Sequence, residues 1–324
     1  MTIHDPRALR GSAADILTDT PNEKRLVFFW AALSAGLALL TGLLSHILNS
    51  GIAGTGGLAG IGLRSILTTA QQMLNTFLSI ALPFWTLGYQ RVMLQFARRE
   101  QATKETLLFG FRRFGPGLRL MLLKGLLFGA IGMFIFYGAL QLLSFTSLAD
   151  SVYTVLDPVV ESIMADPSAS LDPALSDLLM EALLPMMLIC AGITLAVLIP
   201  ISYRLRFSDL RIVDDPRCGA RDAIRTSFLL TKGKCLALFK LDLRFWWFWL
   251  IEAGIVAVCY GDVLLPLLGI TLPISETVAF WGFYVVAMVL QVVLYTAFHN
   301  RVSLTYALAY ESLFPQPENL LPNE

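Results

Sequence analysis

The stretch AIRTSFLLTKGKCLALFKLDLRFWWFWL, residues 223–250, decides the fold of this chain. Its first half mixes basic and apolar residues, and Gly233 separates that half from an apolar segment that contains three tryptophans. Tryptophan is enriched where a membrane meets water, because its indole ring is apolar but carries one hydrogen-bond donor. The stretch is therefore typical of an amphipathic segment on a membrane surface that continues into a transmembrane helix.

The composition of the whole chain supports the same class of protein. Of 324 residues, 56% are hydrophobic and 15% are charged, whereas a soluble domain has about 25% charged residues. Long apolar runs predict an all-α, polytopic membrane fold with short amphipathic helices at the membrane surface. The six predicted transmembrane helices are residues 26–48, 66–89, 118–143, 183–203, 245–268 and 278–297.

The distribution of lysine and arginine predicts how the six helices are oriented. With the N-terminus in the cytoplasm, 23 of the 24 basic residues fall in cytoplasmic segments and only Arg64 lies outside. Short loops rich in basic residues stay in the cytoplasm. We therefore expect cytoplasmic tails at residues 1–25 and 314–324 around a membrane domain at residues 26–313.

Two connecting segments carry their own helix signals. The external loop at residues 144–181 holds seven acidic residues and no lysine or arginine. Asp157-Pro158 and Asp172-Pro173 predict the starts of two short helices, since proline favours the first helical position. The acidity fits either a solvated surface or a vestibule that collects cations. On the cytoplasmic side, Thr103 is a candidate cap for a short helix that Gly115-Pro116-Gly117 would end.

Polar residues follow one face of the second predicted span. Ser65, Thr69, Gln72, Thr76 and Ser79 are spaced by three or four residues, which places them along one side of a helix. Such a face is costly to expose to lipid. It can hold neighbouring helices together or line a polar pathway, and both alternatives stay open.

One acidic residue lies deep in a predicted span. Glu252 is eight residues beyond Arg244, about 12 Å into the fifth span. Gln291 lies at a similar depth in the sixth span, and we expect the two side chains to form a hydrogen bond. Thr76 and Ser79 are further candidate partners of this intramembrane polar site. Ionisable groups at such depth usually mark a functional site, but a structural hydrogen bond is the alternative.

A second acidic residue, Asp242, precedes the tryptophans of the opening stretch. Arg244 points to another side of the same helix, because residues two apart do not face each other. We expect Asp242 to pair instead with Arg204 or Arg206, at the end of the fourth span. This pair would act as a structural clamp.

Several segments together resemble a known family. They are GYQRVMLQFARRE (88–100), LFGFRRFG (108–115), IPISYRLRFSDLRIVDD (199–215), the opening stretch and NRVSLTYALAYESL (300–313). In order and spacing they look like the bacterial integral membrane proteins of domain-of-unknown-function family 975. The chain departs from the family pattern at Cys235-Leu236-Ala237, where an aromatic and a basic residue are usual. The resemblance implies a multi-pass integral membrane protein of bacteria and no particular reaction. We expect the inner membrane, and the distribution of basic residues places both termini in the cytoplasm.

The sequence favours a non-enzymatic membrane component that binds lipids or a protein partner. Its basic cytoplasmic loops suit the anionic inner leaflet, and a membrane-protein partner or a homo-oligomer fits equally well. A secondary transporter or channel that uses Glu252 is the alternative. No catalytic, cofactor-binding or metal site is expected, because the four cysteines and three histidines are scattered and no catalytic motif is present. Zero net charge gives no reason to expect a nucleic-acid partner.

Overall fold

A computed structural model describes residues 5–20, 22–51, 58–165, 173–267, 269–270, 273 and 275–314. Every regular element in these ranges is a helix, which confirms the all-α prediction. The chain forms two compact units, residues 1–120 with 207–324 and residues 121–206. Each unit is described separately below.

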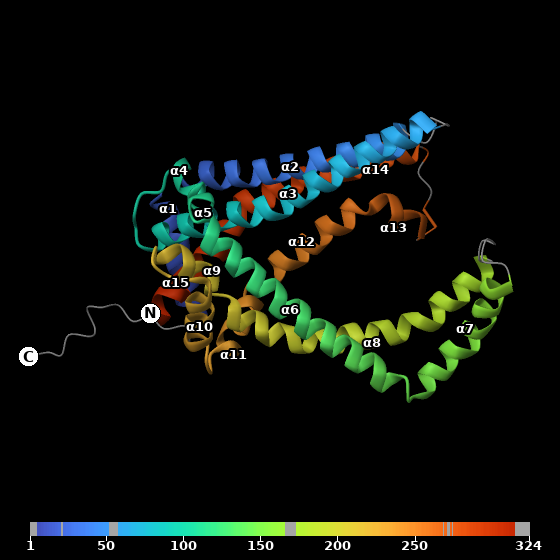
Figure 1. Cartoon of the computed structure of the whole chain (residues 1–324). Helices are drawn as coiled ribbons and strands as arrows, with labels where there is room; N and C mark the ends of the chain where they lie inside the picture. Colours follow the sequence, from blue (N-terminus) through green and yellow to red (C-terminus); the bar gives the residue numbers. More distant parts are fainter. Residues whose placement is uncertain are drawn as a thin grey trace, which may run out of the picture. The chain divides into compact units, whose positions relative to one another are not determined.

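Long helices form the body of the first unit (Figure 1). They are α2 (Glu23–Gly51), α3 (Leu58–Ala97) and α14 (Glu276–Leu294). The helix α2 packs against both α3 and α14, and α12 (Trp246–Cys259) packs on α14 and leads into α13 (Gly261–Leu267). The Tyr284 hydroxyl of α14 donates to the Ala38 carbonyl of α2 at 2.9 Å.

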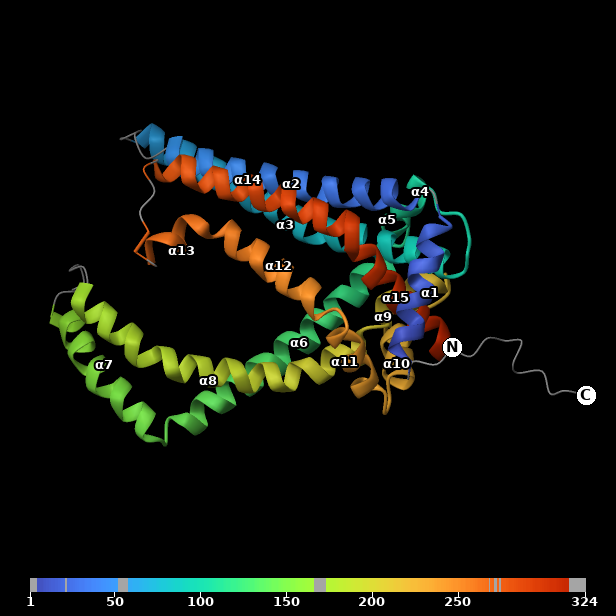
Figure 2. The same cartoon turned by 180° about the vertical axis from the view of Figure 1, so that it is seen from behind.

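Short helices gather at one end of this bundle, as Figure 2 shows from behind. They are α1 (Pro6–Thr18), α4 (Lys104–Leu107), α5 (Phe109–Arg112), α9 (Ser208–Asp214), α10 (Ala220–Leu230) and α11 (Cys235–Leu243). The helix α10 begins after Gly219, and Gly233, with φ +73°, separates α10 from α11. The break at Gly233 was predicted, and its positive φ is a conformation that glycine adopts without strain, whereas Gly219 is an extended residue before the first turn of α10.

The centre of this end is the last helix, α15 (Asn300–Leu313). It packs against α1 and α3, and Leu304, Ala307 and Tyr310 are fully buried. The sixth predicted span continues into α15 through a π-helix, η1 (Tyr295–His299). The predicted N-terminal tail contains α1, whose buried Leu9, Ala13, Ile16 and Leu17 form its inner face. Both chain ends therefore contribute to one packed core.

Close backbone contact explains two glycines in this core. A side chain on Gly88 of α3 would collide with the Leu107 carbonyl of α4, and one on Gly110 of α5 would collide with the Phe84 carbonyl of α3. The two short helices can therefore lie directly on the α3 backbone. No such requirement is visible for Gly125 and Gly129 of α6 (Phe114–Leu143), because nothing described lies within 4 Å of a Cβ built there.

The second unit contains most of α6 (Phe114–Leu143), then α7 (Ser147–Ala165) and α8 (Pro173–Leu205). The helix α7 packs along α8, and the Leu198 side chain of α8 approaches Gly132 of α6. Large apolar side chains of α6 and α8 are exposed, among them Phe134 at 82%. Such exposure is typical of helices that are solvated by lipid.

Three local predictions differ from the structure. Gly115-Pro116-Gly117 lies in the first turn of α6, where proline is tolerated because its missing N–H has no intrahelical partner there, so this segment does not end a helix. Asp157-Pro158 lies inside α7, which begins at Ser147. The helix α8 does begin at Pro173, but it runs through to the fourth predicted span rather than forming a separate short helix.

Within the described residues, four helical segments are long and apolar enough to cross a membrane. They are Glu23–Leu43, Phe114–Leu143, Glu181–Asp214 and Thr277–Leu313. They match the first, third, fourth and sixth predicted spans, whereas α3 and α12, which contain the second and fifth, are not among the four. The helix α12 is about 21 Å long, shorter than the ~30 Å of a hydrocarbon core. The chain thus has the character of a membrane protein, while the count of six is not confirmed. The predicted C-terminal tail after Phe314 lies outside the described residues.

Candidate functional site

The predicted intramembrane site is built around a tyrosine that the sequence argument did not include. Tyr295 of η1 donates its hydroxyl hydrogen to Glu252 Oε1 of α12 at 2.7 Å. The same hydroxyl accepts a hydrogen bond from Gln291 Nε2 of α14 at 3.4 Å. Glu252 and Gln291 thus meet as partners of one hydroxyl, and the expected direct bond is replaced by this bridge. A carboxylate, a phenol and an amide on two helices form the polar site.

Aromatic rings surround this site on one side. The His299 ring stacks on Tyr295 at 4.6 Å, and Trp30 and Tyr89 stack on His299 at 5.5 Å each. His299 Nε2 lies 3.2 Å from the Ser303 hydroxyl, and Phe248 of α12 closes the cluster at 5.9 Å. The rings come from α2, α3, α12 and the π-helix, so this cluster joins four elements of the bundle.

The π-helix explains why Tyr295 and His299 can contact different helices. A π-turn contains one more residue than an α-turn, so side chains after it point in a direction that an unbroken α-helix would not give. Tyr295 reaches Glu252, while His299 stacks among rings from α2 and α3. Single π-turns within α-helices frequently mark functional sites.

The remaining predicted partners of Glu252 lie elsewhere. Thr76 donates to the Gln72 carbonyl at 2.8 Å, and Ser79 donates to the Thr76 carbonyl at 2.8 Å. Both side chains lie on an exposed face of α3. In the described part of the chain, neither hydroxyl bonds to Glu252. The hydroxyls satisfy their own helix backbone, as serine and threonine do on helices in apolar surroundings.

The predicted clamp joins residues of different units. Asp242 belongs to the first unit, in α11, whereas Arg204 and Arg206 belong to the second. Asp242 is half-buried and lines a groove between α11 and α12. The clamp stays a prediction.

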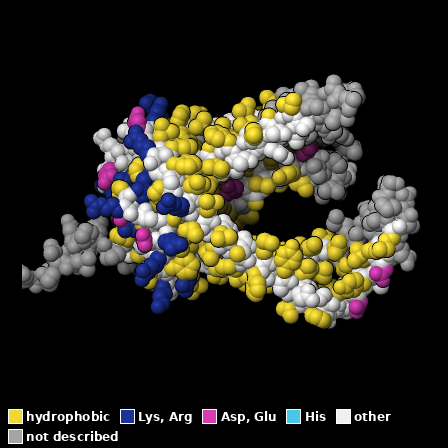
Figure 3. Space-filling model, in the orientation of Figure 1, with side chains coloured by type: hydrophobic (Ala, Val, Ile, Leu, Met, Phe, Trp, Pro, Cys, Tyr) yellow, Lys and Arg dark blue, Asp and Glu magenta, His cyan; other side chains and the backbone are white. Residues whose placement is uncertain are grey.

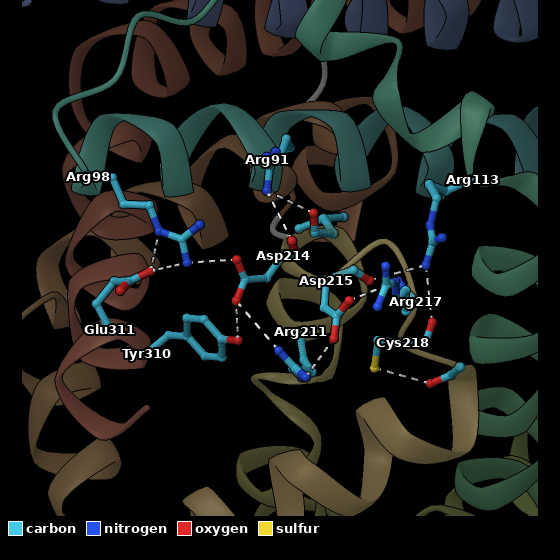
Figure 4. A network of polar contacts seen from close by, with 12 residues as sticks. Arg91, Arg98, Arg113, Arg211, Asp214, Asp215, Arg217, Cys218, Tyr310 and Glu311 are labelled. Carbon is cyan, nitrogen blue, oxygen red and sulfur yellow. Dashed lines mark hydrogen bonds and ion pairs between the residues drawn. The ribbon is translucent and has the colours of Figure 1, made fainter. Parts of the chain in front are cut away.

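A second polar network lies at the end of the first unit where the short helices gather (Figure 4). Asp214, at the end of α9, is its centre and is only 10% exposed. Arg98 Nη2 lies 2.7 Å from Asp214 Oδ1, and the Tyr310 hydroxyl donates to Asp214 Oδ2 at 2.9 Å. Arg98 also lies 2.7 Å from Glu311 of α15. One carboxylate therefore ties α9 to α15 and to the residue that directly follows α3.

Two further arginines hold the same loop by its backbone. Arg91 of α3 donates to the Val213 carbonyl at 3.0 Å, and Arg113 donates to the carbonyls of Pro216 and Cys218. Carbonyls at the C-terminal end of a helix lack partners within that helix. Arg91 supplies such a partner to the end of α9, and Arg113, directly after α5, binds two carbonyls of the loop that follows, so the turn after α9 is fixed on two sides.

The Asp214 network stabilises the positive charge of Arg98. Burial works against the charged form of Arg98, but hydrogen bonds and attraction from Asp214 and Glu311 outweigh it and raise the pKa of the guanidinium. Burial raises the pKa of the Cys218 thiol as well. A thiol with a raised pKa is a poor nucleophile at neutral pH, so Cys218 has a structural environment rather than a reactive one.

Sequence reasoning missed Tyr295 and the Asp214 network. In sequence, Asp214-Asp215-Pro216 is typical of a turn and has no motif that predicts a polar network. The signal that could have found the network was the set of segments that carry the family resemblance. Arg91 and Arg98 belong to residues 88–100, Asp214 to residues 199–215, and Tyr310 to residues 300–313.

Comparison with known proteins adds one finding. The family model described as "Protein of unknown function (DUF975)" matches residues 27–312. No curated protein and no solved structure matches the chain.

Proposed function

From the premise that this chain belongs to the family of unknown function DUF975, we propose that it is a non-enzymatic membrane component that binds anionic lipid. The proposal includes six transmembrane helices, with α3 as the second span and α12 together with α13 as the fifth. Both termini are cytoplasmic and the membrane is the bacterial inner membrane. The distribution of basic residues in the sequence supports this orientation.

Charge separation within the first unit supports a surface at the inner leaflet. Figure 3 shows Lys and Arg gathered at the end where the short helices lie, whereas hydrophobic side chains cover the long helices. Basic residues near an anionic leaflet each contribute about 1 kcal/mol of attraction.

The observation that carries the proposal is the surface of α11 and the start of α12. Its large apolar side chains are exposed, and Trp246 at 58% and Trp249 at 43% are among them. A groove of ≈ 400 Å³ runs along it, which we call the α11–α12 groove and which is lined by Phe239, Asp242, Leu243, Trp246, Trp249 and Leu250. Lys240 and Arg244 are exposed on the same helical segment. The groove is mostly apolar and fits an acyl chain, and Lys240 and Arg244, which do not line it but are exposed on the same helical segment, suit the phosphate of that lipid.

Native mass spectrometry of the full chain in detergent tests this proposal. We expect phosphatidylglycerol to bind more tightly than phosphatidylcholine with the same acyl chains. The double substitution Lys240→Gln with Arg244→Gln should weaken phosphatidylglycerol binding about thirtyfold, since two attractions of ~1 kcal/mol are lost. The matched control is Arg221→Gln with Arg225→Gln, on the exposed face of α10. Equal losses in both double variants, or no loss in either, would argue against a lipid site in the groove.

A specific observation favours the alternative, a secondary transporter or channel. The Glu252–Tyr295–Gln291 site lies beside a π-helix, and both features are frequent where helices of membrane proteins carry function. This alternative requires Glu252 to exchange a proton or a cation. The lipid-binding proposal needs Glu252 only as the acceptor of a structural hydrogen bond.

A further inference from the structure

A pocket in the first unit is separate from both the α11–α12 groove and the Glu252 site. It has a volume of ≈ 520 Å³, within the range of small-molecule pockets. Three elements enclose it: the end of α1, the start of α2 and the junction of η1 with α15. The lining residues are Ala14, Leu17, Thr18, Thr20, Glu23, Lys24, Ala297, Asn300 and Arg301.

One acidic group in this pocket lacks a partner. Glu23 is 2% exposed, and its Oε1 has no hydrogen bond to any described residue. Burial of a carboxylate is costly unless hydrogen-bond donors compensate it. Lys24 and Arg301 are near enough to attract Glu23, but both side chains are exposed, and neither forms an ion pair with it in the described structure. The Glu23 carboxylate therefore has no hydrogen-bond donor among the described residues, and a ligand that enters the pocket could supply one.

The other polar groups of the pocket include hydrogen-bond acceptors and cations. The hydroxyl hydrogens of Thr18 and Thr20 are donated to the Asp15 and Ile16 carbonyls at 2.7 and 2.8 Å. Their oxygens remain free to accept hydrogen bonds. Together with Glu23 they form a set of acceptors suited to an ammonium group. Lys24 and Arg301 are cations on the same lining, and such cations suit a phosphate.

We propose that this pocket binds a primary ammonium joined to a phosphate, the chemistry of a phosphoethanolamine headgroup. The ammonium donates to Glu23 and the threonine oxygens, and the phosphate lies between Lys24 and Arg301. The pocket is at the start of the first apolar run, where a phospholipid headgroup would lie in the proposed topology. This inference rests on the proposed lipid binding only for the source of the headgroup, because free phosphoethanolamine carries the same groups.

Native mass spectrometry of the full chain tests the inference with phosphatidylethanolamine and phosphatidylcholine of identical acyl chains. The trimethylated headgroup of phosphatidylcholine has no N–H to donate. We expect a preference for phosphatidylethanolamine of about tenfold, as a charge-assisted hydrogen bond gives. Glu23→Gln should reduce this preference, because the glutamine oxygen still accepts a hydrogen bond but carries no charge, whereas Glu105→Gln, at an exposed acid of α4, should retain it. Lys24→Gln with Arg301→Gln should weaken both lipids alike.

Two measurements make the result decisive. The melting temperature of the Glu23→Gln protein should not fall, because glutamine replaces an unpartnered buried carboxylate without changing its shape. Competition by glycerophosphoethanolamine, which has no acyl chains, shows whether the pocket binds a free headgroup or requires an intact lipid. Equal binding of the two lipids to the wild type, or an unchanged preference in Glu23→Gln, would overturn the inference. Phosphatidylglycerol binding that still depends on Lys240 and Arg244 would leave the proposed function intact.

Discussion

At the scale of single residues, Tyr295 is the unexpected centre of the polar site. Its hydroxyl donates a hydrogen bond to Glu252 and accepts one from Gln291. Tyr295→Phe keeps the ring that stacks on His299 and Trp30 but leaves the carboxylate without that donor. We expect a loss of about 1–3 kcal/mol of stability, seen as a lower melting temperature in detergent. Tyr260→Phe, at a ring that is 60% exposed, is the control and should change little.

Glu252→Gln gives this prediction its sharper form. A glutamine oxygen can still accept from Tyr295, so a structural hydrogen bond predicts near-normal stability and normal lipid binding for this variant. A transport site requires a charge that can exchange a proton or a cation. Proteoliposomes that contain the variant would then lose the proton or cation uptake that wild-type proteoliposomes show. Wild-type uptake that disappears in Glu252→Gln would favour the transporter over the proposed function.

The sequence located this site but not its geometry. Glu252 and Gln291 could be paired by depth, because a helix rises a constant 1.5 Å per residue. The bridging residue depended on where a π-turn falls, and five residues of η1 carry no distinctive composition that predicts one. Thr76 and Ser79 also matched in spacing, but their hydroxyls had backbone carbonyls within reach.

At the scale of elements, Asp214 joins three helices that are far apart in the sequence. Asp214→Asn removes the negative charge that Arg98 and Arg211 face and that Tyr310 contacts. Charged hydrogen bonds of this kind contribute about 1.5–3 kcal/mol each, so we expect a loss of about 2 kcal/mol or more in unfolding free energy. Freed from α9, α15 should open more readily, and trypsin should cleave sooner at Arg301.

The control for Asp214 is Asp222→Asn, at an exposed acid of α10. It removes the same charge from the same end of the unit without touching α15. Equal stability and equal proteolysis of the wild type and both variants would show that the network does not hold α15 in place.

The helix elements also show what the sequence could predict. Gly219 and Gly233 bounded α10 because glycine breaks are local signals. The central place of α15 was not predicted, since the sequence argument used residues 300–313 only as one of the segments that carry the family resemblance. Its burial depends on α1 and α3, which only the tertiary fold brings to it. The same reason applies to Gly88, whose contact with α4 has no signature in sequence.

At the scale of the whole molecule, the number of transmembrane spans determines on which side of the membrane the basic residues lie. Binding to lipids of the inner leaflet requires most of them to be cytoplasmic. If length and composition alone decided, four segments among the residues that the structure describes could cross a membrane. In that arrangement, with the N-terminus cytoplasmic, α4, α5 and α10 would lie outside. Most of the basic residues would then face away from the cytoplasm, contrary to the general bias of membrane proteins. The six-span topology avoids this by using α3 and the α12–α13 pair.

The two topologies invert the sides of two exposed positions, and cysteine labelling therefore distinguishes them. In a variant without the four native cysteines, we introduce Lys104→Cys between α3 and α6 or Thr146→Cys between α6 and α7. Six spans predict that a membrane-impermeant maleimide labels Thr146→Cys on intact cells and Lys104→Cys only after permeabilisation. Four spans predict the reverse. Ile270→Cys is external in both topologies and controls for access. Labelling of Lys104→Cys from outside would place the basic end away from the cytoplasm, and both lipid proposals would then lose the leaflet on which they depend.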